Sequence, residues 1–132
     1  MSVLLALWIV GVMPISARPR AKRVVMIALD GISVPGFTTA HTPNLDNLLA
    51  QGALSLTTRV VMPSVTLPNW TSHLTGSGPE QHGVVDNGWQ IDKKGFPAVE
   101  IDKEGYYPSV FKVMKEEIPE CKTAFYYNWI NL

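Results

Sequence analysis

The sequence has 132 residues, of which 46% are hydrophobic and 17% are charged. This composition is typical of a globular protein and excludes an intrinsically disordered chain. Eleven basic and eleven acidic residues give a formal net charge of zero, so no charge excess indicates binding to duplex nucleic acid or to an anionic membrane. The single cysteine, Cys121, excludes a disulfide framework or a cysteine-based zinc site within one chain.

The first segment differs in character from the rest of the chain. Residues 3–13 are apolar and uncharged, and Pro14 and small residues lead from there to Ala17. This pattern is typical of a signal peptide cleaved after Ala17, and the apolar run is shorter than the roughly 20 residues of a membrane-spanning helix. Residues 1–17 are therefore predicted to direct export to the periplasm or the extracellular space, and residues 18–23 to form a basic linker. Because basic residues follow the apolar run and none precedes it, a short anchor or a start upstream of Met1 stays open as an alternative.

Three short runs beyond the linker are predicted to be β-strands. Residues 24–29 are apolar and rich in β-branched side chains, which predicts a strand buried on both faces of a parallel sheet. Residues 54–62 and residues 122–127 have the composition of two further strands. The chain ends at residues 128–132, directly after the last of these runs, which leaves the predicted sheet short of strands. Residues 24–132 are therefore expected to be the N-terminal portion of a larger, truncated domain.

Helices are predicted between these strands. Thr42 and Pro43 predict a helix start, and Gly52 predicts its stop. A short helix is expected from about Pro68, and residues 108–118 have apolar side chains at helical spacing. The alternation of strands and helices predicts an α/β fold.

Three positions have side chains suited to catalysis. Asp30 follows the first predicted strand, where open α/β sheets place functional groups, although an Asp-Gly pair also makes plain turns. Thr66 precedes the helix expected from Pro68, so its hydroxyl would lie at a helix N-terminus, which favours bound anions. Asn69 could donate a hydrogen bond to a phosphoryl oxygen. On physical grounds alone, Thr66 serves equally well as a simple helix cap.

A glycine-rich stretch at residues 75–87 contains His82 but no Walker A lysine, so a nucleotide P-loop is not supported. The histidines at positions 41, 73 and 82 form no His-x-x-x-His pair. These residues alone therefore do not predict a metal site.

In their order along the chain, these motifs resemble the type I phosphodiesterase/nucleotide pyrophosphatase family of the alkaline phosphatase superfamily. The resemblance is carried by Asp30-Gly31 after a strand, by residues 42–45 (TPNL), by residues 66–69 (TLPN), and by residues 74–76 (LTG) and 79–84 (PEQHGV). It covers about residues 23–127. It implies an alkaline-phosphatase-like, mostly parallel sheet with helices on both faces, of which this chain would hold an incomplete part.

The resemblance also implies roles for individual residues. In the family, the counterpart of Asp30 binds zinc, that of Thr66 is the nucleophile and also contacts zinc, and that of Asn69 holds a phosphoryl oxygen. His82 matches a histidine that is not a usual metal ligand. The complete domain is expected to hold two Zn²⁺ ions and to act on a small phosphodiester or nucleotide substrate. Since the remaining ligands would lie beyond residue 132, the chain alone is expected to be inactive.

Other functions stay open at this stage. One alternative is a phosphomonoesterase, phosphonate hydrolase or phosphoryl-group transferase of the same superfamily. Another is a non-catalytic exported remnant, either a binding module or a decayed gene product.

Overall fold

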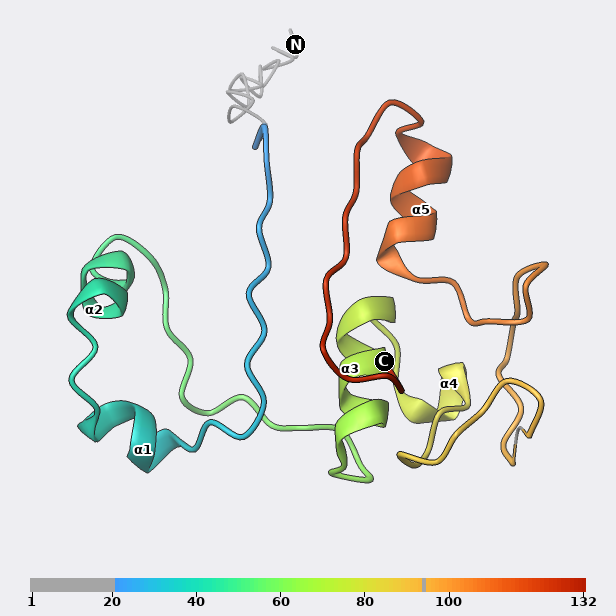
Figure 1. Cartoon of the computed structure of the whole chain (residues 1–132), viewed down its shortest axis with the longest axis horizontal. Coiled ribbons are helices and arrows are strands. Elements are labelled where there is room, and N and C mark those ends of the chain that lie inside the picture. Colours follow the sequence, from blue (N-terminus) through green and yellow to red (C-terminus); the bar gives the residue numbers. More distant parts are fainter. Residues whose placement is uncertain (1–20, 94) are drawn as a thin grey trace, which may run out of the picture.

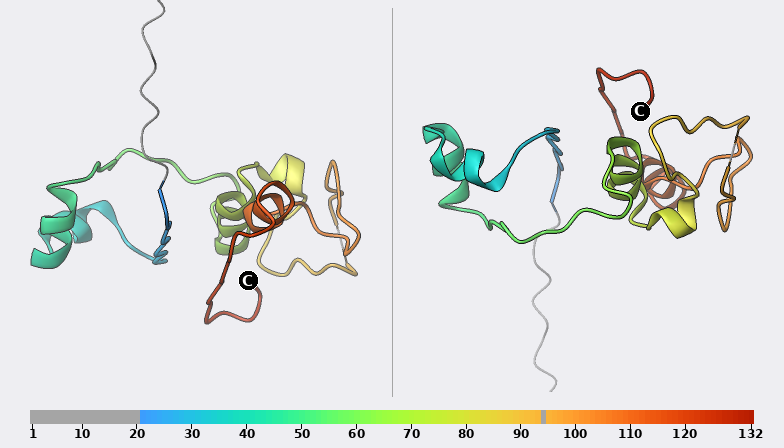
Figure 2. Two further views of the ribbon diagram at one scale, coloured as in Figure 1. Left: turned by 90° about the horizontal axis from the view of Figure 1, so that it is seen from above. Right: turned by 90° about the horizontal axis from the view of Figure 1, so that it is seen from below.

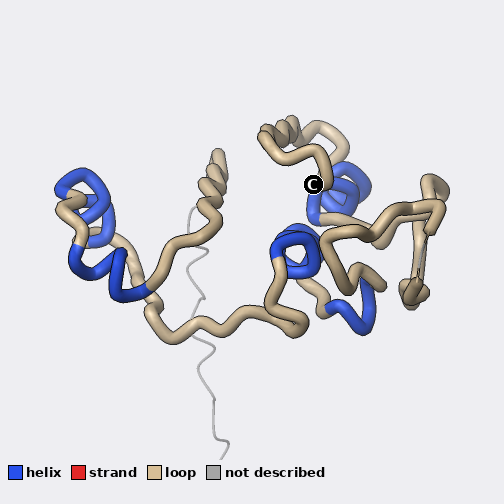
Figure 3. Tube along the Cα trace, turned by 60° about the horizontal axis from the view of Figure 1, so that its bottom comes forward, coloured by secondary structure: helices blue, strands red, loops and turns tan. Residues whose placement is uncertain are grey.

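The computed structural model describes residues 21–93 and 95–132, and within these ranges the regular secondary structure is entirely α-helical (Figure 1). The helices are α1 (Val34–Thr39), α2 (Pro43–Leu49), α3 (Thr66–Thr75), α4 (Pro79–His82) and α5 (Val110–Glu117). Long irregular or extended connections join them. The trace coloured by secondary structure shows only helices and loops in the described residues (Figure 3).

The predicted α/β fold with a mostly parallel sheet is therefore wrong for the described residues. Each of the three runs expected to be strands, residues 24–29, 54–62 and 122–127, lacks ladder hydrogen bonds to another segment. A β-strand exists only when a neighbouring strand satisfies its backbone N–H and C=O groups. The apolar composition of these runs led to the strand prediction, but composition does not supply a pairing partner.

Local sequence signals explain where the two N-terminal helices begin. At α1, the Ser33 hydroxyl accepts a hydrogen bond from Gly36 N at 3.2 Å, as an N-cap side chain does. At α2, Thr42 occupies the N-cap position and Pro43 the first helical turn, which confirms the predicted start. The Thr42 hydroxyl donates to Asp46 Oδ1 at 3.1 Å and makes no bond to a backbone N–H. The helix ends at Leu49, before the predicted glycine stop.

Helix α3 begins at Thr66, two residues before the expected proline start. Pro68 fits within the first turn because a helix leaves the N–H groups of that turn without internal partners. The helix ends at Gly76, which adopts a left-handed conformation with φ +69°. The composition of residues 63–88 did not predict α4.

The buried residues of the chain lie between α3 and α4. Helix α3 packs against α4 and α5, whereas α1 and α2 contact none of the other described helices closely. The side chains of Leu67 and Val84 are each 5% exposed, His82 is 2% exposed, and Pro68 is fully buried. In both views of Figure 2, α1 and α2 lie apart from the group of α3, α4 and α5. The core of the chain is therefore formed by residues after position 61.

The predicted signal peptide, residues 1–17, lies outside the described residues, and so do residues 18–20 of the predicted basic linker at 18–23. Within the described part of the chain, every helix is too short or too polar to cross a bilayer.

Candidate functional site at the start of helix α3

Thr66 is the first residue of α3, and its side chain is half-buried. Its hydroxyl has no hydrogen-bond partner among the described residues. The other threonines of the same helix differ: Thr71 Oγ1 donates to Leu67 O at 2.8 Å, and Thr75 Oγ1 donates to Thr71 O at 2.8 Å. The hydroxyl of Thr66 is thus the one in α3 that remains free to react or to bind a ligand.

The backbone donors at this helix start are mostly occupied. Leu67 N donates to the side-chain Oδ1 of Asn87 at 2.8 Å, across 20 residues of sequence. Pro68 has no N–H, and Asn69 N donates to Val65 O at 3.4 Å. An anion at this end of α3 would therefore meet the N–H of Thr66, the helix dipole and the Thr66 hydroxyl.

The Asn69 side chain links α3 to the preceding loop. Its Oδ1 accepts from Val61 N at 2.9 Å, while its Nδ2 donates to Val65 O at 2.8 Å and to Pro63 O at 3.3 Å. Both amide hydrogens therefore have backbone partners. Asn69 lies on the first turn of α3 with Thr66, but it would have to give up a backbone bond to hold a phosphoryl oxygen.

Asp30 lies at the end of the exposed extended segment that precedes α1. Its Oδ1 accepts from Gly31 N at 2.8 Å, and Gly31 has φ +75°, so the pair forms a local turn. No hydrogen bond or shared cavity connects Asp30 to Thr66 in the described residues. The structure brings together Thr66 and Asn69, but not Asp30.

A zinc ion in a catalytic site takes about three protein ligands and one open position. Among the described residues, no group of three or more His, Cys, Asp or Glu side chains lies close enough together to hold a metal ion. Asp30 and Thr66 are too few for such a site. The described part of the chain therefore does not by itself fit the two zinc ions that the resemblance implies.

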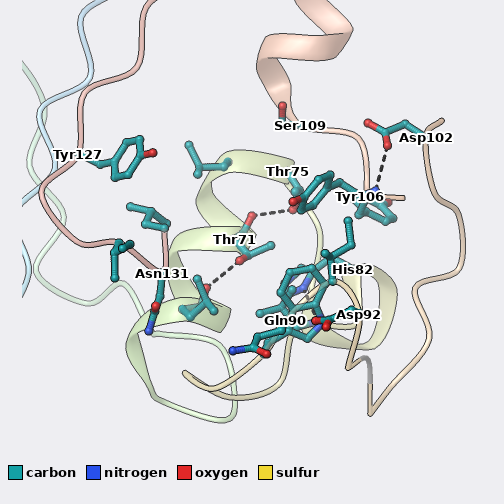
Figure 4. Close-up of a pocket in the computed structure, with 18 residues that line it drawn as sticks. Thr71, Thr75, His82, Gln90, Asp92, Asp102, Tyr106, Ser109, Tyr127 and Asn131 are labelled. Carbon is teal, nitrogen blue, oxygen red and sulfur yellow. Dashed lines mark hydrogen bonds between the residues drawn. The ribbon is translucent and has the colours of Figure 1, made fainter. Parts of the chain in front are cut away.

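A cavity of about 640 Å³ lies beside α3 and is lined in part by Leu67, Thr71 and Thr75 of that helix (Figure 4). Aromatic side chains line much of it, including Trp89 and Tyr106, whose ring centroids are 6.2 Å apart. The Trp89 indole N–H is buried there without a hydrogen-bond partner among the described residues. Neither Thr66 nor Asp30 lines this cavity, so its size alone does not make it the catalytic centre.

His82 is a structural residue that borders the cavity (Figure 4). Val84 N donates to its Nδ1 at 3.1 Å, so that nitrogen must be the acceptor. The other nitrogen, Nε2, then carries the hydrogen and donates to Ser72 Oγ at 3.0 Å. This arrangement fits only the neutral imidazole. Burial lowers the pKa of His82, and the nearby carboxylate of Glu80 opposes that shift only partly.

We expect acid to destabilise the chain through His82. Because its pKa is lowered in the folded state, the unfolded chain binds this proton more readily, and stability falls as the pH drops below the ordinary value of 6.5. His82→Gln should cost about 1–3 kcal/mol at neutral pH and remove this part of the pH dependence. Urea unfolding followed by circular dichroism at pH 7.5 and 5.5 measures both effects. His73→Gln, at an exposed histidine of α3, is the control substitution.

Sequence reasoning missed two residues that organise the site. Asn87 accepts the bond from Leu67 N at the helix start, and the Ser72 hydroxyl is the partner of His82 Nε2. Neither position carries a local signal, because each acts on a residue 10 or 20 positions away. Such contacts become visible only in three dimensions.

The chain is similar in sequence to a known protein family and to several known proteins. The family model described as type I phosphodiesterase/nucleotide pyrophosphatase matches residues 24–129. Ectonucleotide pyrophosphatase/phosphodiesterase family member 3 of Mus musculus is 35% identical over 66 residues, which covers 48% of this chain and 8% of that protein. Bis(5'-adenosyl)-triphosphatase enpp4 of Mus musculus is 30% identical over 83 residues, which covers 61% of this chain and 18% of that protein.

A venom phosphodiesterase of Macrovipera lebetinus is 23% identical over 148 aligned positions, which covers 83% of this chain and 17% of that protein. The chain thus spans less than a fifth of the length of these relatives. No solved structure matches it. The family match nevertheless extends over most of the chain, from the first extended run to Trp129, and so the chain belongs to the type I phosphodiesterase/nucleotide pyrophosphatase family.

Proposed function

We propose that the chain contributes the nucleophile to a hydrolase of phosphodiester or pyrophosphate bonds, and that the nucleophile is Thr66. The observation that carries this proposal is the uncommitted Thr66 hydroxyl at the first position of α3. Family membership and the names of relatives, which include a phosphodiesterase and a triphosphatase, support the reaction class. The experiment that tests it is Thr66→Ala in a protein that carries this chain within a complete catalytic domain, where turnover should be lost.

The reaction assigned to Thr66 is a double displacement. Thr66 Oγ attacks phosphorus, so a phosphorus–oxygen bond forms to Thr66 while the bond to the leaving alcohol or phosphate breaks, and the proton lost by Thr66 is taken up by that leaving group. The intermediate is a threonine phosphoester that keeps the remaining substituent of the substrate. Water then attacks its phosphorus, the bond to Thr66 Oγ breaks, one water proton goes to Thr66 Oγ, and the phosphate monoester or nucleoside monophosphate is released. The positive end of the α3 dipole and the Thr66 N–H favour the negative charge that collects on the phosphoryl oxygens.

Asn69 and Asp30 complete the proposal. Asn69 would turn one amide hydrogen from the carbonyl of Pro63, its longer bond at 3.3 Å, to a phosphoryl oxygen. Asp30 would supply a carboxylate ligand to zinc, a metal that lowers the pKa of a bound hydroxyl or water group. The described residues do not bring Asp30 to Thr66, so the proposed role of Asp30 rests on the family pattern.

We expect the 132-residue chain alone to be inactive even with added zinc. The described residues contain no cluster of three metal-ligating side chains, and Asp30 and Thr66 alone do not hold a catalytic ion. Release of p-nitrophenolate from bis(p-nitrophenyl) phosphate with excess Zn²⁺ should equal the rate of zinc in buffer. Turnover that requires the chain and disappears with a chelator would contradict this prediction.

A further inference from the structure

His82, the last residue of α4, is a buried polar side chain with both ring nitrogens bonded. Val84 N donates to Nδ1 at 3.1 Å, and Nε2 lies 3.0 Å from Ser72 Oγ. A histidine that binds a metal or accepts a proton needs a free nitrogen lone pair. In His82 that lone pair is on Nδ1 and is taken up by Val84 N, so the ring acts through the residues that it holds.

The pair of Ser72 and His82 is not a catalytic dyad. In such a pair the imidazole accepts the hydroxyl proton of the serine. Here Nε2 carries the hydrogen, because Nδ1 accepts from Val84 N, and the serine oxygen is the acceptor. The described residues also place no cluster of metal-ligating side chains around the ring. A role in positioning other groups remains.

The bond to Nδ1 fixes the chain where it leaves α4. Gly83 turns the backbone through a left-handed conformation with φ +76°, and the next amide, Val84 N, is the one that His82 holds. The Val84 side chain is 5% exposed, so this residue is held by both its amide and its side chain. A second turn follows, in which Gly88 N donates to Asp86 Oδ1 at 2.7 Å. Two turns thus lie in close succession after the ring.

Asn87 lies in the second turn and leads back to α3. Its Oδ1 accepts from Leu67 N at 2.8 Å, and Leu67 directly follows Thr66. From Val84 to Asn87 the chain can span at most about 11 Å, so a shift of the Val84 amide is passed on to the Asn87 side chain. The fixed amide of Val84 therefore helps to determine where Leu67 N, and with it the Thr66 hydroxyl, is held.

We propose that His82 is a positioning residue for Thr66: its Nδ1 holds the Val84 amide and thereby holds Asn87 against the start of α3. The bond from Nε2 to Ser72 contributes less to this role, because buried side chains on both helices hold α3 and α4 together without it. Val84 N, in contrast, has no other hydrogen-bond partner among the described residues. The inference rests on the proposed role of Thr66 as nucleophile.

Two substitutions of His82 separate its two bonds. Asparagine places an amide oxygen near the position of Nδ1 and can keep the bond from Val84 N, whereas glutamine places its amide near Nε2 and can keep the bond to Ser72. In a complete catalytic domain that carries this chain, His82→Gln should lower kcat for a chromogenic phosphodiester at least about tenfold and leave KM within about threefold, because a misplaced nucleophile slows the reaction without weakening substrate binding. His82→Asn should keep kcat within about threefold of the wild type.

Amide hydrogen exchange in the 132-residue chain measures the same linkage without any activity. His82→Gln should raise the exchange rate of Leu67 N–H at least about tenfold, and His82→Asn should not. Ser77→Ala is the control, in the connection between α3 and α4. It removes the part-buried hydrogen bond between Ser77 Oγ and Tyr107 Oη at 2.9 Å and should change neither kcat nor the exchange of Leu67 N–H.

The wild-type chain provides a test that needs no substitution and therefore still applies if a variant does not fold. Protonation of His82 puts a hydrogen on Nδ1 and breaks the bond from Val84 N. The protection factor of Leu67 N–H, relative to that of Gly76 N–H at the other end of α3, should then fall at least about tenfold as the His82 ring resonance titrates. Burial lowers the pKa of His82, so this change falls below the ordinary value of 6.5.

Other titratable groups surround the ring, and following the His82 resonance itself separates its titration from theirs. Among the elements around His82, α4 carries Glu80, α3 carries His73, and the cavity wall contains Asp92, Asp102, Tyr106 and Tyr107.

Three results would overturn the proposal. They are a kcat for His82→Gln within about threefold of the wild type, equal losses of kcat in His82→Gln and His82→Asn, and protection of Leu67 N–H that is unchanged when His82 is protonated. Retained turnover in Thr66→Ala would contradict the proposed function instead, and the exchange measurements would still decide whether His82 holds the start of α3.

Discussion

Thr66→Ala should reduce phosphodiester hydrolysis by about 10⁴-fold or more when the chain is part of a complete catalytic domain of its family. Alanine removes the oxygen that we propose attacks phosphorus, which belongs to the first residue of α3. The measurement is kcat with a chromogenic phosphodiester, together with mass spectrometry of the peptide that contains Thr66 after rapid acid quenching. The wild-type peptide should carry a phosphoryl group that keeps the remaining ester substituent of the substrate, and the variant peptide should carry no adduct.

Two further variants separate loss of the nucleophile from loss of structure. Thr66→Ser keeps the hydroxyl and should retain turnover to within about 100-fold of the wild type. Thr71→Ala removes a hydroxyl that is bonded to Leu67 O, one turn along the same helix, and should leave kcat nearly unchanged. If Thr66→Ala kept kcat within about tenfold of the wild type, Thr66 would not be the nucleophile.

Gly83→Ala should destabilise the chain by about 3 kcal/mol or more. Gly83 ends α4 with φ +76°, and a Cβ there would lie 2.6 Å from Phe96 O and 2.9 Å from Ala98 N. These neighbours are backbone atoms of a segment fixed to α4 by the bond from Val99 N to Gln81 O at 2.8 Å, so they cannot move aside easily. Thermal or urea unfolding monitored by helical circular dichroism measures the loss.

Gly76→Ala is the matched control for this effect. Gly76 ends α3 with φ +69°, but a Cβ there would meet nothing within 4 Å. The substitution should therefore cost only the strain of a left-handed alanine, about 1 kcal/mol. Equal losses for the two variants would show that the contact with Phe96 and Ala98 contributes nothing to stability.

The sequence predicted a helix correctly where the signal for it lies within a few neighbouring residues. Thr42 and Pro43 predicted the start of α2, and the amphipathic spacing at 108–118 predicted α5, which runs from Val110 to Glu117. The order of the motifs around Thr66 and Asn69 predicted the family, which the match over residues 24–129 confirms. Each of these signals depends on residues within a few positions of one another, or on their order along the chain.

The sheet could not be predicted correctly because pairing is not a property of one segment. The segment at residues 24–29 has the side chains of a buried strand, yet in the structure it is exposed along its whole length. The start of α3 also depends on a residue that is distant in sequence and therefore could not be predicted from a local pattern. The sequence singled out Thr66 as a candidate but not Asn87, whose side chain accepts the bond from Leu67 N, 20 residues away.

The hydrogen bonds around α3 join residues that are separated by different lengths of sequence. These lengths indicate the order in which the bonds form as the chain folds. The bonds from Val61 to Asn69, from Ser72 to His82 and from Leu67 to Asn87 join residues 8, 10 and 20 positions apart. Those from Ser77 to Tyr107 and from Asn131 to Asn87 span 30 and 44 positions.

Short loops cost less entropy to close and form sooner than long ones. During synthesis, the turn that presents Thr66 can therefore be complete once residue 87 has left the ribosome, before α5 exists. The later segments then add to a helix start that is already formed, so the Thr66 hydroxyl is positioned by early, local folding.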